Sequence, residues 1–175
     1  MQYFPLQRHQ ITRSLFRDFI RRQMVTDCYR RVDGAWTVQS DPFIDDWSEH
    51  DYAFLVKCLQ NTIASGGVVI GAFWQTQLKG FVSVEGQPMG KNGDYLDMTS
   101  LHTSADMRGC GIGQELFSRA AGWAKSRGAK KLYISSHSAV ETQAFYAAMG
   151  CVDAIEPDAR HIAAEPYDRQ LEYVL

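Results

Sequence analysis

The sequence predicts a mixed α/β fold of the α+β type, with a sheet that is antiparallel at first and ends in a parallel βαβ unit. Two observations support this. The spacing of apolar residues changes from helical to alternating along the chain. In the C-terminal half the elements then follow as strand, helix, strand, helix, strand, which is typical of a parallel crossover. Because 175 residues can bury one sizeable core, we expect a single domain over 1–175.

The N-terminal third is predicted to be helical. Residues 11–31 place apolar side chains at helical spacing, and 33–47 are turn-rich, with Asp33-Gly34 and Asp41-Pro42 marking bends. A second helix is expected to begin at Ser48, with Asp51 completing the cap. Its apolar stripe comprises Tyr52, Leu55, Val56, Leu59 and Ile63, and Gly66-Gly67 ends it.

Strands follow from residue 68. The segments 68–73 and 80–85 flank a turn, and 95–103 is the next strand. A helix over 111–127 ends at Gly128, where a C-terminal glycine is favoured. The remaining elements are a strand at 131–135, a helix at 140–149 closed by Gly150, and a terminal strand at 170–175.

Charge and composition argue against several partners. The net charge is -2, from 18 basic and 20 acidic residues, so no global attraction to nucleic acid or to an anionic membrane is expected. The four cysteines are scattered without metal-ligand spacing, and we expect no metal. No apolar run has the length of a signal peptide or a membrane span, which predicts a cytoplasmic protein.

One loop carries a chemical signal, because three glycines alternate between a strand and a helix. Such a backbone turns tightly and converges its N–H groups beside the positive end of the helix, where an anion binds. The alternative is a glycine turn that only permits close packing. The spacing fits neither a dinucleotide fingerprint nor a Walker loop. The segment reads Arg108-Gly109-Cys110-Gly111-Ile112-Gly113.

This segment resembles the Arg/Gln-x-x-Gly-x-Gly/Ala motif of the GCN5-related N-acetyltransferase (GNAT) family, which binds the pyrophosphate of acetyl-CoA. A second stretch, Phe145-Tyr146 followed by Gly150-Cys151, is similar to the family's later helix. The resemblance is specific over roughly 95–155, the expected cofactor-binding part. It implies a mostly antiparallel, twisted sheet of six to seven strands flanked by about four helices.

The resemblance also implies roles for particular residues. Tyr146 would protonate the leaving thiolate, and the loop Arg108 to Gly113 would hold the pyrophosphate. The strand residues Leu101, His102 and Thr103 would lie along the acetyl and pantetheine portions, with backbone groups of Leu101 and Thr103 hydrogen bonding to them. The family often has an asparagine where this chain reads Ser135-Ser136-His137-Ser138-Ala139, so Ser136 or Ser138 would substitute for it.

The base that takes the ammonium proton has several candidates. Relatives that modify lysines carry a glutamate on the strand that here holds Asp97, and alternation would place Asp97, Thr99, Leu101 and Thr103 on one face. His102 and His137 are rivals because a histidine titrates near neutral pH. Glu165 and Asp168 either line the acceptor mouth or are solvated loop charges.

Two further charge groups have open interpretations. The arginines at 21, 22, 30 and 31 either form an exposed helix face or contact the cofactor's 3′-phosphate or an acidic acceptor. The acidic residues near the second helix either suit a cationic acceptor or form a solvated turn and cap; they are Asp41, Asp45, Asp46, Glu49 and Asp51.

The sequence therefore predicts an N-acetyltransferase in which a primary amine of a small molecule or peptide attacks acetyl-CoA directly. The alternatives are a non-catalytic acyl-CoA sensor with the same fold and a protein that binds ATP at the glycine loop. The terminal strand is expected to be exposed at a sheet edge, which would allow a homodimer.

Overall fold

The computed structural model describes residues 1–175 and contains two four-stranded sheets, a separate hairpin and four α-helices. The mixed α/β fold with mostly antiparallel pairing is thereby confirmed. In the first sheet the order is β1-β4-β5-β7, with β1 (Gln2–Pro5), β4 (Val68–Trp74), β5 (Gln77–Val84) and β7 (Ser100–Thr103), all antiparallel.

The second sheet has the order β6-β8-β10-β9. β6 (Tyr95–Asp97) pairs parallel with β8 (Lys131–Ser136), and β10 (Arg169–Val174) runs antiparallel between β8 and β9 (Val152–Asp153). The terminal strand is therefore not an exposed edge, contrary to the sequence prediction, because β9 covers part of its outer side.

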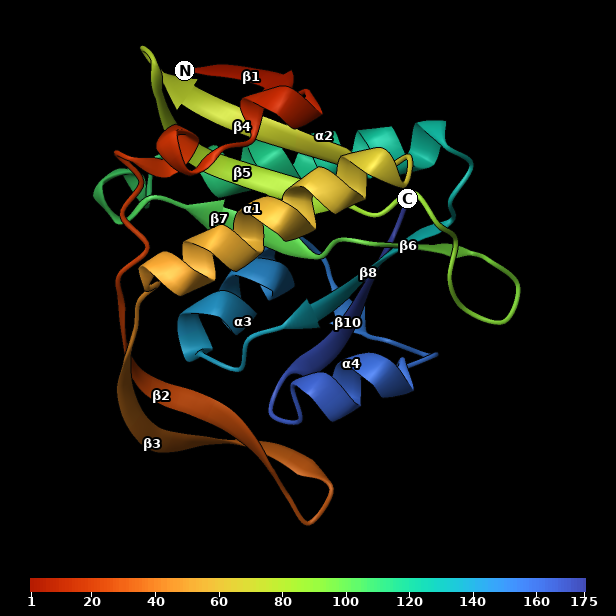
Figure 1. Ribbon diagram of the computed structural model, residues 1–175. Coiled ribbons are helices and arrows are strands. Elements are labelled where there is room, and N and C mark those ends of the chain that lie inside the picture. Colours follow the sequence, from red (N-terminus) through yellow and green to blue (C-terminus); the bar gives the residue numbers. More distant parts are fainter.

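Helices cover both faces of the first sheet (Figure 1). α1 (Glu49–Ala64) lies on one face, with 3₁₀ turns at Arg8–Gln10 and Arg13–Phe16, around a cluster that includes Phe16, Leu59 and Phe81. α2 (Ile112–Ser126) covers the opposite face, where the larger cluster also takes up Tyr146 of α3 (Val140–Ala148). A third 3₁₀ turn, Ala105–Met107, precedes α2, and α4 (Ala159–Ala164) lies over the second sheet. No helix combines the length and apolar character that crossing a membrane requires.

The prediction of a helix over 11–31 is wrong. Its first part forms the 3₁₀ turn Arg13–Phe16, and its second part is β2 (Gln23–Val32), which pairs with β3 (Ala35–Asp45) in a hairpin. The hairpin belongs to neither four-stranded sheet (Figure 1) and is attached to the loop between β8 and α3, where Tyr29 N donates to Ser138 O at 2.8 Å. Asp33-Gly34 turns the chain with φ values of 50° and 83°, the geometry that an Asp-Gly hairpin favours. Tertiary strand pairing has overridden the helical spacing, and the arginines at 21, 22, 30 and 31 form no helix face.

The predicted strand 95–103 is divided at its centre between the two sheets. Met98 N donates to Tyr133 O of β8 at 2.9 Å, whereas Thr99 N donates to Ser83 O of β5 at 3.1 Å. From this point β7 follows β5 and leaves β8. Because side chains alternate between the two faces of a strand, a one-residue irregularity moves every later side chain to the opposite face.

The prediction that four side chains share one face of this strand is therefore wrong; they are Asp97, Thr99, Leu101 and Thr103. Met98 and Leu101 both contact the cluster under α2, although simple alternation would place them on opposite faces. His102 instead contacts Phe81 in the cluster under α1.

The start of α1 was predicted correctly and offers a test of local stability. The Ser48 side chain accepts from Asp51 N, and Asp51 accepts from Ser48 N at 2.8 Å, forming a capping box. We expect Ser48→Ala to lower the free energy of unfolding by about 1 kcal/mol, because backbone donors at the helix start lose their acceptor. Urea denaturation measures this, with Lys57→Ala at an exposed position of α1 as control; equal effects would contradict the capping role.

Candidate active site

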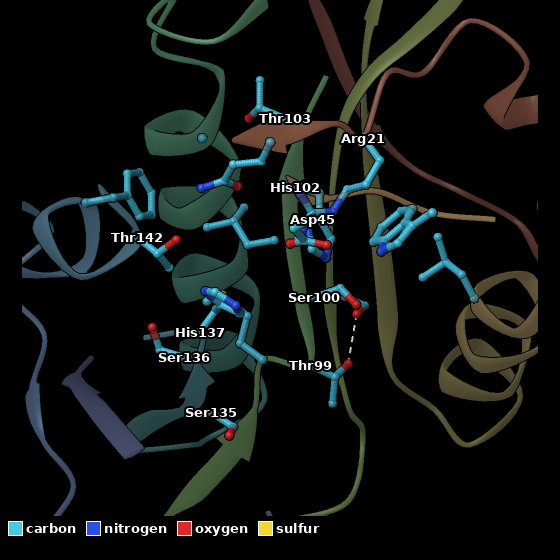
Figure 2. Close-up of a pocket in the computed structure, with 18 of the residues that line it drawn as sticks. Arg21, Asp45, Thr99, Ser100, His102, Thr103, Ser135, Ser136, His137 and Thr142 are labelled. Atoms are coloured by element: carbon cyan, nitrogen blue, oxygen red, sulfur yellow. Dashed lines mark hydrogen bonds and ion pairs between the residues drawn. The ribbon is translucent and has the colours of Figure 1, made fainter. Parts of the chain in front are cut away.

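A cleft of about 1490 Å³ opens where β7 and β8 diverge. Its lining includes residues of α1, α2, α3, β7 and β8, the end of the hairpin, and the loop between α4 and β10. Figure 2 shows Ser135, Ser136 and His137 on one side and Thr99, His102 and Asp45 on the other. The cleft thus joins the predicted cofactor segment to elements from both ends of the chain.

The divergence frees backbone groups of β7. In an antiparallel ladder, alternate residues direct their N–H and C=O groups toward the same neighbouring strand. Ser104 N donates to Lys79 O at 2.9 Å, and this register continues along β7. The alternation directs the backbone groups of Leu101 and Thr103 away from β5 and toward the cleft. Both residues line it, as the sequence predicted.

The glycine loop forms an anion cradle at the start of α2. Gly109 and Gly111 have φ values of 77° and 78°, which side chains with a Cβ rarely adopt. Gly111 is the N-cap and supplies no side-chain acceptor, so the first N–H groups of α2 keep their hydrogen-bonding capacity. A Cβ at Gly113 would lie 3.3 Å from Phe145 Cε2, so α2 and α3 approach closely there. These features fit a bound pyrophosphate.

Arg108 supplies positive charge beside the cradle. Its Nη2 donates to Arg21 O at 3.2 Å. Burial and the neighbouring Arg21 lower the pKa of Arg108, so this region favours an anion electrostatically. Gly109, Gly111, Ile112 and Gly113 line the cleft with Arg108. Cys110 does not: it is exposed, and its thiol donates to Arg108 O at 3.8 Å.

An ion pair between buried Lys79 and partly exposed Asp106 fixes the approach to this loop. Lys79 is 5% exposed, and its Nζ lies 2.7 Å from Asp106 Oδ2 and donates to Asp18 O at 3.0 Å. Ser104 Oγ accepts from Ile20 N at 2.9 Å and donates to Asp106. The turn before the cradle is thereby tied to β5 and to the N-terminal segment.

Tyr146 projects from α3 and lines the cleft while remaining 7% exposed. Its hydroxyl makes no hydrogen bond within the protein, whereas a buried tyrosine hydroxyl usually has a partner. Burial raises the pKa of Tyr146 well above its ordinary value. The phenol therefore stays protonated at neutral pH and can donate a hydrogen bond or a proton.

The two serines that were predicted to contact the cofactor lie in different surroundings. Ser136 lines the cleft, and its Oγ accepts from Gln143 Nε2 at 2.9 Å. Ser138 lies outside the lining: its carbonyl accepts from Tyr29 N at 2.8 Å and its Oγ accepts from Arg30 Nη1 at 2.6 Å. Ser138 thus anchors the hairpin, and its contact with pantetheine stays a prediction.

The three residues predicted as possible bases have different surroundings. Asp97 is not part of the lining, and its Oδ2 lies 2.7 Å from His161 Nε2. His102 lines the cleft, but burial, Arg21 and Arg108 lower its pKa to about 3, so its basicity is weak. His137 lines the cleft beside Phe43, and burial lowers its pKa as well.

Carboxylates dominate the charged lining. Seven acidic side chains face two guanidinium groups, those of Arg21 and Arg108. Only Asp45 has a Lys or Arg partner within 4.0 Å, namely Arg21. The predicted acidic group is divided, because Asp41 and Glu49 lie outside the cleft. The seven are Asp45, Asp46, Asp51, Glu85, Glu141, Glu165 and Asp168.

Asp168 has the most perturbed carboxyl of this set. Burial, and then the nearby charge of Glu165, raise the pKa of Asp168 to about 6. Ser135 Oγ lies 3.5 Å from its Oδ2. A carboxylate that titrates near neutral pH inside a cleft is suited to accept a proton.

The sequence interpretation missed Glu85 and Arg21 as lining residues. Glu85 is held by hydroxyl groups, with Thr62 Oγ1 donating to its Oε1 at 2.6 Å and Ser65 Oγ lying 3.4 Å from its Oε2. For Glu85 the sequence did contain a signal, because a carboxylate follows directly after an apolar strand. Arg21 belongs to the arginine run for which contact with the cofactor or an acidic acceptor was one of two interpretations, and the wrongly predicted helix favoured the exposed face instead.

The comparisons with known proteins agree with this geometry. The chain matches the acetyltransferase (GNAT) family over residues 22–151. A search of curated proteins by sequence finds no match. The covered residues are well over half of the chain, so the protein belongs to the GNAT acetyltransferase family.

Solved structures support the same fold. A nourseothricin acetyltransferase superposes with a TM-score of 0.68 at 15% identity, covering 98% of this chain and 95% of that one. A putative streptothricin acetyltransferase from Bacillus anthracis strain Ames, in complex with acetyl coenzyme A, gives 0.69 at 15% identity with the same coverage. An aminoglycoside 6′-acetyltransferase type Ii gives 0.62 at 16%, covering 99% and 97%. At these identities the likeness concerns the fold.

The raised pKa of Asp168 predicts a pH-dependent effect on stability. The folded protein holds this proton up to about pH 6, whereas the ordinary carboxyl value is 3.8, so stability falls as pH rises through this window. We expect Asp168→Asn to raise the free energy of unfolding at pH 8 on the order of 1 kcal/mol and to have little effect near pH 4. Urea denaturation at both pH values measures it. A gain of equal size at both would contradict the raised pKa.

Proposed function

We propose that this protein transfers the acetyl group of acetyl-CoA to a primary amine of a cationic small-molecule acceptor. The observation that carries the proposal is the cleft at the β7–β8 divergence, which is lined both by an anion cradle and by carboxylates without a Lys or Arg partner. An anionic cofactor and a cationic acceptor would thus enter one cleft from regions of opposite charge.

The residues present fit acetyl-CoA on one side of the cleft. The N–H groups at the start of α2 and the Arg108 guanidinium suit the pyrophosphate, and the outward backbone groups of Leu101 and Thr103 suit the amide-rich pantetheine arm. Bound acetyl-CoA supplies the thioester that the amine attacks. The exposed backbone N–H groups of β7 are suited to stabilise negative charge on its carbonyl oxygen.

Proton transfer requires an acceptor and a donor, and the cleft offers both. Asp168, with its pKa of about 6, is mostly ionised at neutral pH and would take the proton from the ammonium group before attack. Tyr146, whose hydroxyl has no partner in the protein, would donate a proton to the thiolate that leaves. Asp168 replaces Asp97 as the proposed base because Asp97 does not line the cleft.

The cationic acceptor is argued from charge. Six of the seven lining carboxylates, all except Asp45, have no Lys or Arg within 4.0 Å, although the chain has 18 basic side chains. An acceptor with ammonium groups would neutralise these carboxylates. We call the part of the cleft that they line the acceptor wall. The names of the related folds, which include nourseothricin, streptothricin and aminoglycoside acetyltransferases, are consistent with such an acceptor.

Ligand binding gives the first test. Acetyl-CoA should raise the melting temperature more than ATP at equal concentration, because a ligand that binds only the folded state stabilises it more the lower its Kd is relative to its concentration. A panel of mono-, di- and polyamines and aminoglycosides, with release of the CoA thiol as readout, then tests transfer. Tight acetyl-CoA binding without turnover of any amine would favour the non-catalytic sensor, and a larger shift with ATP would favour a nucleotide-binding protein.

Two substitutions test the assigned roles. We expect Asp168→Asn to lower kcat/KM for the amine roughly 10²-fold or more, the usual range for loss of a general base.

Tyr146→Phe should lower kcat at least about tenfold while acetyl-CoA binding is retained. Glu49→Gln is the matched control, because Glu49 is exposed and lies outside the cleft. An unchanged rate in Asp168→Asn would exclude it as the base.

A further inference from the structure

The short helix α4 and the loop after it form part of the acceptor wall without being held by a hydrophobic core. None of the residues Ala159–Ala164 is buried, and none belongs to a hydrophobic cluster. A six-residue helix is too short to be stable by itself. Specific polar contacts must therefore determine where the helix lies.

One side chain provides the main contact. His161 Nε2 lies 2.7 Å from Asp97 Oδ2 of β6, and it is the only α4 side chain that hydrogen-bonds to a strand. The His161 ring also lies against Tyr133 of β8, with centroids 5.4 Å apart and an angle of 32° between the planes. Asp158, the N-cap of α4, donates its backbone N–H to Tyr133 Oη at 2.8 Å.

Asp97 depends on this contact in return. It is 9% exposed, and its Oδ1 is buried without any hydrogen-bond partner. The carboxylate thus has His161 as its only side-chain partner, and the bond to Asp97 raises the pKa of His161. Because a buried carboxylate without a partner is costly, the pair favours a single position of α4 over the sheet.

The chain connects this pair directly to the cleft. Glu165 N donates to His161 O at 2.9 Å, and Asp168 N donates to Glu165 O at 3.1 Å. Glu165 and Asp168 line the cleft, whereas Asp97 and His161 do not. A shift of His161 therefore moves both carboxylates, while the cradle on α2 is unaffected.

We propose that Asp97 and His161 are positioning residues, whose contact sets the place of Glu165 and Asp168 and so determines how well the acceptor amine is bound and deprotonated. This inference rests on the proposed transfer to an amine. Its structural part, the docking of α4 through this pair, can be measured without turnover.

The experiment compares Asp97→Asn, His161→Ala, the double variant and His161→Gln, with His9→Gln as a matched loss of an exposed histidine. We expect hydrogen exchange over 159–168 to increase at least about tenfold in Asp97→Asn and His161→Ala, and not in the control. The kcat/KM for the amine should fall about tenfold or more in both, with the KM for acetyl-CoA within twofold. The double variant should be no worse than either single one, because the two residues act as one unit.

His161→Gln, which keeps a donor near Asp97, should restore part of the activity. A large fall of kcat in Asp97→Asn with normal His161→Ala would show that Asp97 acts as the base itself and would overturn the positioning role. Unchanged exchange over 159–168 would overturn it whether or not an amine is acetylated. Changed exchange in a protein that acetylates no amine would leave the docking correct and refute the proposed function.

Discussion

The structure depends on the point where one strand changes its partner. At Met98–Thr99 the chain leaves β8 and joins β5, so a continuous segment belongs to two sheets. This change opens the cleft and exposes backbone groups of Leu101 and Thr103, while the hydrophobic cluster under α2 continues across both sheets. A regular strand over 95–103 would have paired its N–H groups and closed the site. The irregularity is the feature that converts a sheet into a binding site.

The parts around this opening are tied together by polar contacts. Lys79 and Asp106 fix the turn before the cradle, Ser138 anchors the hairpin, and Arg21 connects two regions through its salt bridge to Asp45 and its carbonyl contact with Arg108. Apolar packing builds the scaffold, while these directional contacts determine where the functional loops lie. The same division explains why α4, which has no apolar anchor, relies on the contact between His161 and Asp97.

The helices and turns around the glycine loop were predicted correctly because their sequence signals are local. The glycine positions, the cap at Ser48 and the helices after residue 110 were all recovered to within a few residues. The segment 11–31 was wrong because its apolar spacing resembles a helix while the Asp33-Gly34 turn and pairing with β3 decide its conformation. The face assignment of Asp97 was wrong because a one-residue irregularity leaves no mark in the alternation. The acceptor wall gathers residues from four distant segments, and spacing along the chain cannot show that they meet.

The unpaired carboxylates of the cleft have a consequence for the evolution of the protein. Burial and the nearby charge of Glu165 raise the pKa of Asp168, so the ionised side chain lowers the stability of the free folded protein. Selection for stability alone would therefore replace Asp168 with a neutral residue. A substitution that stabilises the protein at this position is thus expected to be one that removes the proposed activity.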